Sequence, residues 1–251
     1  MILDKFSLKD KVAIVTGSDT GLGQGFSKAF VEAGAKVLGV SVVPSEATQE
    51  MLGKENFEYI TADLSTLDPI EGIIKKALDT FGHIDILVNN AGIIKREDTI
   101  DFSVESWDAV INVNLRTLFF LSQAVAKQFM AQKSGGKIIS VASMLSYQGG
   151  IRVPSYTASK SAVKGITMTM ANEWAQYGIN VNAIAPGYMA TNNTKALRAD
   201  ADRSEAILDR IPAGRWGTPD DIMGAAVFLA SSASDYVNGF TLAVDGGWLG
   251  R

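Results

Sequence analysis

Apolar residues are arranged along the chain in two alternating patterns. Short uninterrupted apolar runs are typical of strands buried on both faces, whereas apolar residues that recur every three or four positions are typical of amphipathic helices. The uninterrupted runs predict strands at residues 11–16, 36–43, 57–62, 84–88, 137–142, 179–184 and 241–244. The recurring pattern predicts helices at residues 21–34, 69–81, 103–132 (as one long helix or two), 154–177, 200–210 and 219–230.

The alternation of strands with helices predicts the fold class. It indicates an α/β protein with a parallel sheet covered by helices on both faces. Right-handed crossovers make such a sheet doubly wound, or Rossmann-like. No linker, repeat or low-complexity stretch interrupts the pattern, so residues 1–251 are expected to form a single domain. Ligands of this fold bind at the carboxyl ends of the strands, where Asp63, Asn90, Ser143 and Pro186 lie.

Composition narrows the possible functions. Of 251 residues, 47% are hydrophobic and 20% are charged, which suits a large packed core, and the net charge of −4 gives no indication of nucleic-acid or membrane binding. The chain has no cysteine and a single histidine, His83, so no metal site is expected. No apolar run reaches the ~18 residues of a membrane span, and the first residues lack the apolar core of a signal peptide. Cytoplasmic localisation is therefore expected.

A glycine-rich loop follows the first predicted strand. Gly17, Gly21 and Gly23 have the spacing Gly-x-x-x-Gly-x-Gly, and a helix and a second strand come next. In that context glycines allow a tight turn and let backbone N–H groups approach a pyrophosphate at the start of a helix. The spacing differs from the standard Gly-x-Gly-x-x-Gly fingerprint, but the flanking strand and helix favour nucleotide binding.

The stretch from Ser143 to Lys160 carries candidate chemistry. Ser143 follows the fifth strand, and Tyr156 and Lys160 are four residues apart on the next helix, so they share one face. A phenol has an unperturbed pKa of about 10, and a nearby ammonium is expected to lower that pKa. Tyr156 could then transfer a proton to a substrate oxygen that the Ser143 hydroxyl holds.

Five motifs occur in order along the chain: residues 16–23, Asn89-Asn90-Ala91-Gly92, Ser143, Tyr156-x-x-x-Lys160 and Pro186-Gly187. This set resembles the short-chain dehydrogenase/reductase family in its compact form, over essentially the whole chain. The resemblance implies a nicotinamide cofactor and hydride transfer, with Tyr156 as the acid/base, Ser143 as the ligand of the substrate oxygen and Lys160 on the nicotinamide ribose. It also implies that Asn114 supports Lys160 through water, although the residues alone present Asn114 as an ordinary helix asparagine.

The same resemblance implies which residues bind the cofactor. They are Gly17, Asp19, Thr20, Gly21, Leu22, Gly23, Ser41, Asp63, Leu64, Asn90, Ala91, Gly92, Tyr156, Lys160, Pro186, Gly187 and Met189.

One position departs from the family pattern and bears on the choice between NAD and NADP. Relatives that use NAD commonly carry an acidic residue at the end of the second strand, where this chain has Ser41. Relatives that use NADP usually place an arginine or lysine beside this point or in the glycine loop, where this chain has Val42 and Thr20. Asp19 adds negative charge, so a 2′-phosphate would meet no cation and NAD (NADH) is the expected cofactor.

A narrower resemblance concerns the substrate. Residues 143–156 and 185–194 resemble the sugar-acid branch of the family. That branch implies an NADH-dependent interconversion of 2,5-diketo-3-deoxygluconate and 2-keto-3-deoxygluconate in uronate and pectin breakdown. Two alternatives stay open. One is another reductase of this family, acting on gluconate or on a 3-oxoacyl carrier protein, and the other is a nucleotide-binding regulator without catalysis.

A keto sugar acid needs a local cation, because the net charge of −4 gives no long-range attraction. A planar guanidinium suits a carboxylate best. Arg152, between Ser143 and Tyr156, is the first choice, and Arg96 or Lys95 is the next, since Glu97 and Asp98 offer Arg96 an ordinary ion pair. The residues expected to bind substrate are Ser143, Gln148, Arg152, Arg96 and Tyr156.

The resemblance implies two larger features as well. The charge-rich stretch after Pro186-Gly187 is expected to form a substrate lid at about residues 188–212, which closes over the ligand. A homotetramer is also expected, with the helices at 103–132 and 154–177 forming one interface.

Overall fold

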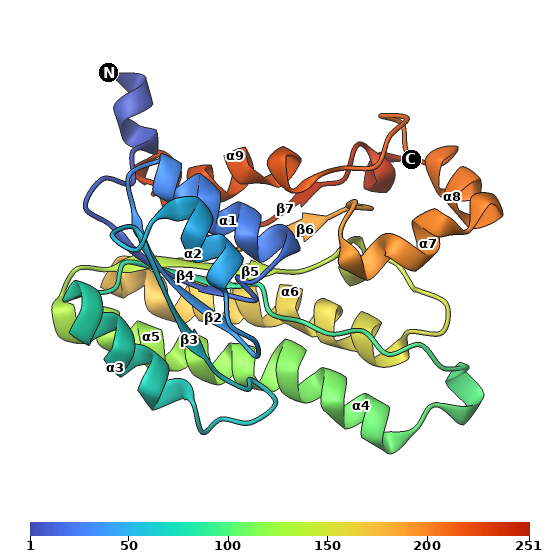
Figure 1. Cartoon of the computed structure of the whole chain (residues 1–251), viewed down its shortest axis with the longest axis horizontal. Helices are drawn as coiled ribbons and strands as arrows, with labels where there is room; N and C mark the ends of the chain where they lie inside the picture. Colours follow the sequence, from blue (N-terminus) through green and yellow to red (C-terminus); the bar gives the residue numbers. More distant parts are fainter.

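Seven parallel strands form one sheet in the order β3-β2-β1-β4-β5-β6-β7 (Figure 1). The computed structural model describes all 251 residues. The strands are β1 Val12–Thr16, β2 Lys36–Ser41, β3 Phe57–Thr61, β4 Ile86–Asn89, β5 Gly136–Val141, β6 Ile179–Pro186 and β7 Thr241–Val244. The strand order reverses between β1 and β4, and in doubly wound sheets the ligand binds in the crevice at that reversal.

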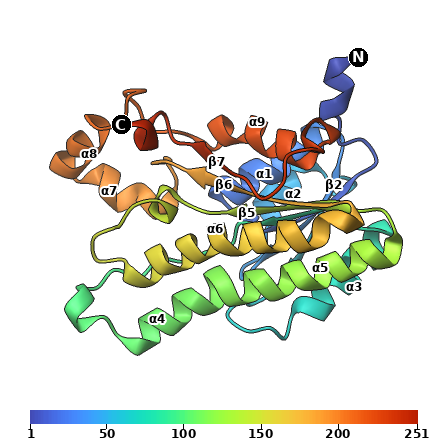
Figure 2. The same cartoon turned by 180° about the vertical axis from the view of Figure 1, so that it is seen from behind.

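Helices cover both faces of the sheet, which confirms the predicted doubly wound α/β fold (Figures 1 and 2). One face carries α1 and α9, and the other carries α3, α5 and α6. The helices are α1 Gly21–Glu32, α2 Glu46–Leu52, α3 Ile70–Phe81, α4 Val104–Ile111, α5 Leu118–Gln132, α6 Pro154–Trp174, α7 Lys195–Ala199, α8 Ala201–Leu208 and α9 Pro219–Ala230. The predicted boundaries hold to within a few residues. The short helices α2 and α7 were not predicted, because they bury one residue and none respectively and so show no apolar periodicity.

The central strands are buried on both faces, as their uninterrupted apolar runs predict. All five residues of β1 are buried. Ala13 and Val15 pack in the cluster beneath α1 and α9, whereas Ile14 between them packs in the cluster on the opposite face. Because successive side chains of a strand point to opposite faces, one apolar run supplies both cores and places the end of β1 at the centre of the sheet.

The predicted helix at residues 103–132 forms one continuous helical stretch, Val104–Gln132, that contains a π-helical segment at Asn112–Thr117. By length and composition alone this 29-residue stretch could cross a membrane, although no uninterrupted apolar run in the sequence indicated a membrane span. Its apolar side chains instead pack in the core. Leu121, Val125 and Phe129 are fully buried against the sheet, so the stretch is apolar because it is a core helix.

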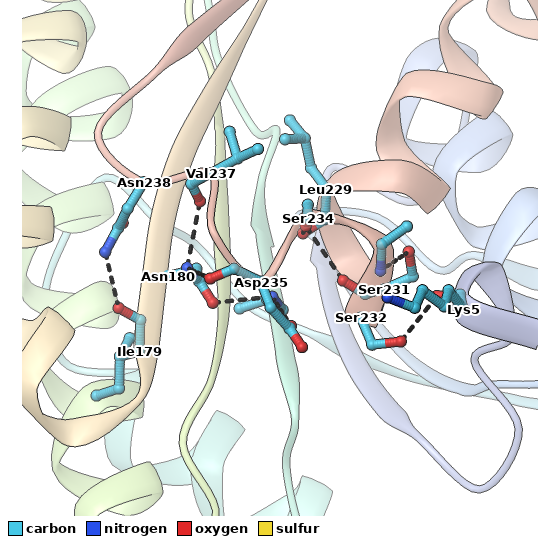
Figure 3. A network of polar contacts seen from close by, with 12 residues as sticks. Lys5, Ile179, Asn180, Leu229, Ser231, Ser232, Ser234, Asp235, Val237 and Asn238 are labelled. Atoms are coloured by element: carbon cyan, nitrogen blue, oxygen red, sulfur yellow. Dashed lines mark hydrogen bonds and ion pairs between the residues drawn. The ribbon is translucent and has the colours of Figure 1, made fainter. Parts of the chain in front are cut away.

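A network of polar contacts fixes the amino end of the sheet (Figure 3). The Asn180 amide at the start of β6 donates to the carbonyl oxygens of Asp235 at 3.0 Å and Val237 at 3.2 Å, and the Asn238 amide donates to the Ile179 carbonyl at 3.4 Å. The Ser232 hydroxyl donates at 3.0 Å to the carbonyl of Lys5, in the N-terminal 3-10 helix. These bonds satisfy the backbone where α9 returns to β7, and they lie at the edge opposite the strand ends that carry the candidate site.

Candidate active site

The loops after β1 and β4 are joined at the reversal of strand order. The Asn90 side chain donates to the Thr16 carbonyl at 2.8 Å, and the backbone N–H groups of Asn90 and Ala91 donate to the Thr16 hydroxyl at 3.0 and 2.9 Å. These hydrogen bonds hold the glycine loop and the Asn90-Ala91-Gly92 turn side by side, so the two motifs form one unit.

The glycine loop has the geometry of a phosphate cradle. Gly17 and Gly21 adopt φ values of +67° and +59°, which disfavour a side chain. A Cβ atom on Gly23 would lie 1.9 Å from the Gly17 carbonyl oxygen, so α1 can approach the loop only with glycine there. The Thr20 side chain makes no capping hydrogen bond, which leaves the first N–H groups of α1 without a side-chain partner. These residues fit a dinucleotide, whose pyrophosphate such N–H groups would bind.

A carboxylate lies at the end of β2 although the strand itself ends in serine. The Ser41 hydroxyl donates to Asp19 Oδ1 at 2.8 Å, and the Asp19 N–H donates back to Ser41 Oγ at 3.3 Å. Ser41 is buried, so it fixes the position of the Asp19 side chain. Neither residues 17–23 nor residues 41–45 contain a lysine or an arginine. Asp19 thus brings to this place the negative charge that family members with NAD usually carry on β2 itself.

The remaining residues predicted to bind the cofactor lie after β3 and β6. The Ser65 N–H donates to Asp63 at 2.9 Å and lowers the pKa of the Asp63 carboxyl, and Leu64 beside it is buried. Gly187 packs so closely on the backbone of Asp245 that a Cβ atom would lie 2.6 Å from Asp245 Cα. Met189 is buried and pairs with Gly217. The first residues after Pro186 are therefore held firmly, ahead of the helices α7 and α8.

Ser143, Tyr156 and Lys160 converge at the ends of β5 and α6. Lys160 is 3% exposed, its Nζ donates to the Val141 carbonyl at 2.6 Å, and Nζ lies 5.6 Å from the centre of the Tyr156 ring. The Ser143 hydroxyl acts on the Tyr156 phenol and lowers its pKa. Pro154, at the first position of α6, needs no N–H partner there and starts the helix that presents both side chains.

The charges at this site correct one expectation. Burial raises the pKa of Tyr156 above 10.0, and the Ser143 hydroxyl and the Arg96 charge offset only part of that rise. The predicted lowering of this pKa by Lys160 is absent. Burial lowers the pKa of Lys160 from 10.5 to about 8, so Lys160 has lost its charge at the pH where the phenol would ionise. Its Nζ is also directed to the Val141 carbonyl. Tyr156 is therefore a protonated acid at neutral pH in the free protein.

Asn114 lies in the π-helical segment and is fully buried. Its Nδ2 donates to the Ile93 carbonyl at 2.9 Å, and its Oδ1 accepts from the Ile93 N–H at 2.8 Å. Gly92 lies between Asn114 and Lys160, since a Cβ atom there would be 3.3 Å from Asn114 Oδ1 and 3.7 Å from Lys160 Nζ. The π-helical turn thus brings Asn114 beside Lys160 without direct contact, and support of Lys160 through water stays a prediction.

The structure changes the order of preference among the arginines. Arg152 Nε forms an ion pair with Asp98 at 2.8 Å. The Glu97 carboxylate accepts from the Ser103 N–H at 2.8 Å and from the Ser106 hydroxyl. Both acids expected to neutralise Arg96 are therefore engaged elsewhere. Arg96 forms no ion pair, and its charge acts on the Tyr156 hydroxyl, so Arg96 is better placed than Arg152 for a substrate carboxylate.

Known proteins resemble this chain over its whole length. The family profile described as Enoyl-(Acyl carrier protein) reductase matches residues 17–249. The 2-dehydro-3-deoxy-D-gluconate 5-dehydrogenases of Escherichia coli and Bacillus subtilis are 63% and 56% identical, over 100% and 99% of this chain and 100% and 98% of theirs. A solved structure from Agrobacterium tumefaciens, described as a 2-deoxy-D-gluconate 3-dehydrogenase with bound NADP, matches with a TM-score of 0.93 and 53% identity, covering 99% of this chain and 100% of that one.

Proposed function

The chain belongs to the short-chain dehydrogenase/reductase family, and from that premise we propose that it interconverts 2,5-diketo-3-deoxygluconate and 2-keto-3-deoxygluconate in uronate breakdown, with NADH as hydride donor. The observation that carries the proposal is the identity of 63%, over the whole chain, with the 2-dehydro-3-deoxy-D-gluconate 5-dehydrogenase of Escherichia coli. The intact set of Ser143, Tyr156, Lys160 and Asn114 argues for catalysis rather than for a regulator that only binds nucleotide.

The chain's own residues divide the work of the reaction. The nicotinamide supplies the hydride chemistry when it is bound. Tyr156 gives its proton to the substrate carbonyl oxygen during reduction, and the Ser143 hydroxyl donates a hydrogen bond to the same oxygen. Lys160 holds the nicotinamide ribose and keeps a positive charge near the phenol. In the oxidative direction Tyr156 must ionise, and burial opposes this by raising its pKa. The positive charge of oxidised nicotinamide would favour the tyrosinate.

A panel of carbonyl substrates tests the proposed function. The purified protein is mixed with NADH and with 2,5-diketo-3-deoxygluconate, 5-ketogluconate or an acetoacetyl thioester, and NADH consumption is followed by absorbance. We expect the highest kcat/KM with the diketo acid. A higher value with 5-ketogluconate or with the thioester would replace this function by one of the two reductase alternatives. Binding of NADH without turnover of any of them would favour the non-catalytic regulator.

We further propose NAD(H) as the natural cofactor pair, on the strength of the Asp19 carboxylate that Ser41 holds at the end of β2. A 2′-phosphate at this point would meet that carboxylate and no cation. The Agrobacterium tumefaciens relative was solved with NADP, so both cofactors have to be compared directly in this chain.

Replacing Asp19 with Asn is expected to tighten NADPH binding by about 10-fold or more and to weaken NADH binding by less. The amide keeps an acceptor for Ser41 but removes the charge that opposes the 2′-phosphate, and such like-charge contacts cost several kcal/mol. Dissociation constants from NADPH and NADH fluorescence titrations measure the effect. Asp79→Asn, on the surface of α3, is the matched control and should change neither constant. Tighter NADPH than NADH binding by the unaltered protein would contradict the proposal.

Replacing Arg96 with Met is expected to raise KM for the keto acid by about 10- to 150-fold, since a charge-assisted hydrogen bond is worth about 1.5–3 kcal/mol. Arg152→Met, which loses the ion pair with Asp98, should have a smaller effect. KM is measured for the acid and for an uncharged analogue. The Arg96 variant should leave the KM of the uncharged analogue almost unchanged. A larger effect of Arg152→Met on the acid alone would restore the original order of the two arginines.

Three expectations about the whole protein remain proposals. We place the enzyme in the cytoplasm, where uronate breakdown supplies its substrate, and we propose that residues 188–212 close over that substrate as a lid. A homotetramer would cover the exposed apolar side chains of Val104, Trp107 and Met168 on α4 and α6.

A further inference from the structure

The Gln148 side chain receives two hydrogen bonds on one atom. The Trp248 indole Nε1 donates to Gln148 Oε1 at 3.2 Å, and Arg210 Nη2 donates to the same oxygen at 3.3 Å. The Arg210 guanidinium also lies 4.1 Å above the Trp248 ring. Three segments that are distant in the sequence therefore meet at one amide: the loop after Ser143, the turn that follows α8 and the C-terminal turn.

The chemistry of the two donors fixes the orientation of the amide. Indole and guanidinium groups donate hydrogen bonds and accept none, so the Gln148 atom between them has to be the carbonyl oxygen. The Nε2 group, with its two N–H donors, must then point away from Trp248 and Arg210. No protein acceptor bonds to Nε2, so this side chain presents free donors on the side away from Trp248 and Arg210.

The loop that carries Gln148 also carries the catalytic serine. The Gln148 N–H donates to the Met144 carbonyl at 3.3 Å, and the Leu145 N–H donates to the Ser143 hydroxyl at 3.1 Å. Ser143 and Gln148 are thus the two ends of one tight turn. Because the Ser143 hydroxyl acts on the Tyr156 phenol, this turn connects the Gln148 amide to the residues proposed for catalysis.

The segments that orient Gln148 are firmly packed. Met144, Ile207, Ile211 and Trp248 form one buried cluster, which joins the serine turn, the lid and the C-terminus. Arg251 adds a hydrogen bond at 2.9 Å to the Asp209 carbonyl. Figures 1 and 2 both show α8 beside the C-terminus, over the edge where the strands end. The amide therefore has its donors directed before substrate binds, which reduces the entropy that binding costs.

We propose that Gln148 is a substrate-specificity residue that donates from Nε2 to an acceptor oxygen of the sugar acid, and that Arg210 and Trp248 are positioning residues that hold its amide in that orientation. The inference rests on the proposed function, because it assigns a ligand of the same substrate. The turn after α8 and the C-terminal turn would then set the direction of a substrate-binding group.

Gln148→Glu is the most direct test, because it keeps the shape of the side chain. One carboxylate oxygen can still accept from Trp248 and Arg210, while the other replaces the free donors by a negative acceptor facing an anionic substrate. We expect KM for the keto acid to rise about 10-fold or more, with kcat changed by no more than about threefold. Gln176→Glu, in the exposed turn before β6, is the matched control and should leave both constants unchanged.

A double-mutant cycle tests the positioning role. Trp248→Phe keeps an aromatic ring but removes the indole donor, so the amide can rotate, and KM is expected to rise about 3- to 10-fold. In Gln148→Met this donor has nothing to orient, so adding Trp248→Phe should raise KM no further. Additive effects would reduce Trp248 to a structural role and overturn the positioning proposal. An unchanged KM in Gln148→Glu, in a protein whose wild type reduces the diketo acid, would overturn the role of Gln148 alone. Absence of turnover by the wild type would instead overturn the proposed function.

Discussion

Replacing Tyr156 with Phe is expected to lower kcat for the keto sugar acid by about 10²–10⁴-fold while NADH still binds. The substitution removes one oxygen and its proton and leaves the ring in place. Because the pKa of Tyr156 stays above 10.0, the phenol is protonated at neutral pH and can supply the proton that reduction requires. The change is measured by the steady-state rate of NADH oxidation and by a fluorescence titration of NADH.

Tyr177→Phe is a suitable control for this variant, since Tyr177 is half exposed in the turn that follows α6. It loses the same atom and should retain full activity. If Tyr156→Phe kept more than about a tenth of the wild-type rate, Tyr156 would not be the acid, and the loss of NADH binding in this variant would mean that the phenol holds the cofactor instead.

Replacing Lys160 with Met is expected to lower kcat/KM by about 10²-fold or more and to weaken NADH binding by about 10-fold or more, yet to leave the apoprotein about as stable as before. The functional losses follow from removing the charge-assisted hydrogen bond that we propose Lys160 makes to the ribose. The stability follows from burial, since holding the ammonium in the protein lowers its pKa from 10.5 to about 8, a cost on the order of 3 kcal/mol at neutral pH. Methionine avoids that cost but leaves the Val141 carbonyl without its donor, which costs about 1–3 kcal/mol.

The pH dependence of stability tests this cause directly. Below pH 8 Lys160 is charged in both the folded and the unfolded protein, so its full unfavourable contribution is present. Between about pH 8 and 10.5 the folded protein has released the proton and the unfolded protein still holds it, so the wild type gains stability as the pH rises. Relative to Lys160→Met, the wild type should gain about 1–2 kcal/mol between pH 7 and 9.5 in urea unfolding of the apoprotein. A constant difference across that range would show that Lys160 is not strained by burial.

The fold was predictable from the sequence because its signals are local. The uninterrupted run of β1 and the periodic run of α1 each report their own burial, and the alternation of such runs fixes the topology. The proximity of the candidate catalytic residues could be predicted for a related reason. Ser143 ends one strand, and Tyr156 and Lys160 lie one turn apart on one helix, so the sequence spacing determines most of their geometry.

The rest of the site depends on contacts between distant segments. Asp98 pairs with Arg152, which adopts a φ of +64° in its loop. The sequence had indicated Arg96 as its partner, because Glu97 and Asp98 directly follow Arg96. The pKa of Tyr156 depends on how deeply the phenol is buried, which no motif reveals. Trp248 lies a hundred residues from Gln148 in the sequence, and no local pattern connects the two.

The positions of the two chain ends affect how the enzyme can be handled. The N-terminal 3-10 helix is joined to the amino edge of the sheet through the Lys5 carbonyl, away from the carboxyl ends of the strands. Arg251 at the other terminus bonds to the Asp209 carbonyl at the end of α8. An affinity tag fused ahead of Met1 would extend from the edge opposite the catalytic groups. A tag fused after Arg251 would emerge beside Trp248 and compete with the contacts that orient Gln148, so kinetic work and immobilisation on a surface both call for attachment through the N-terminus.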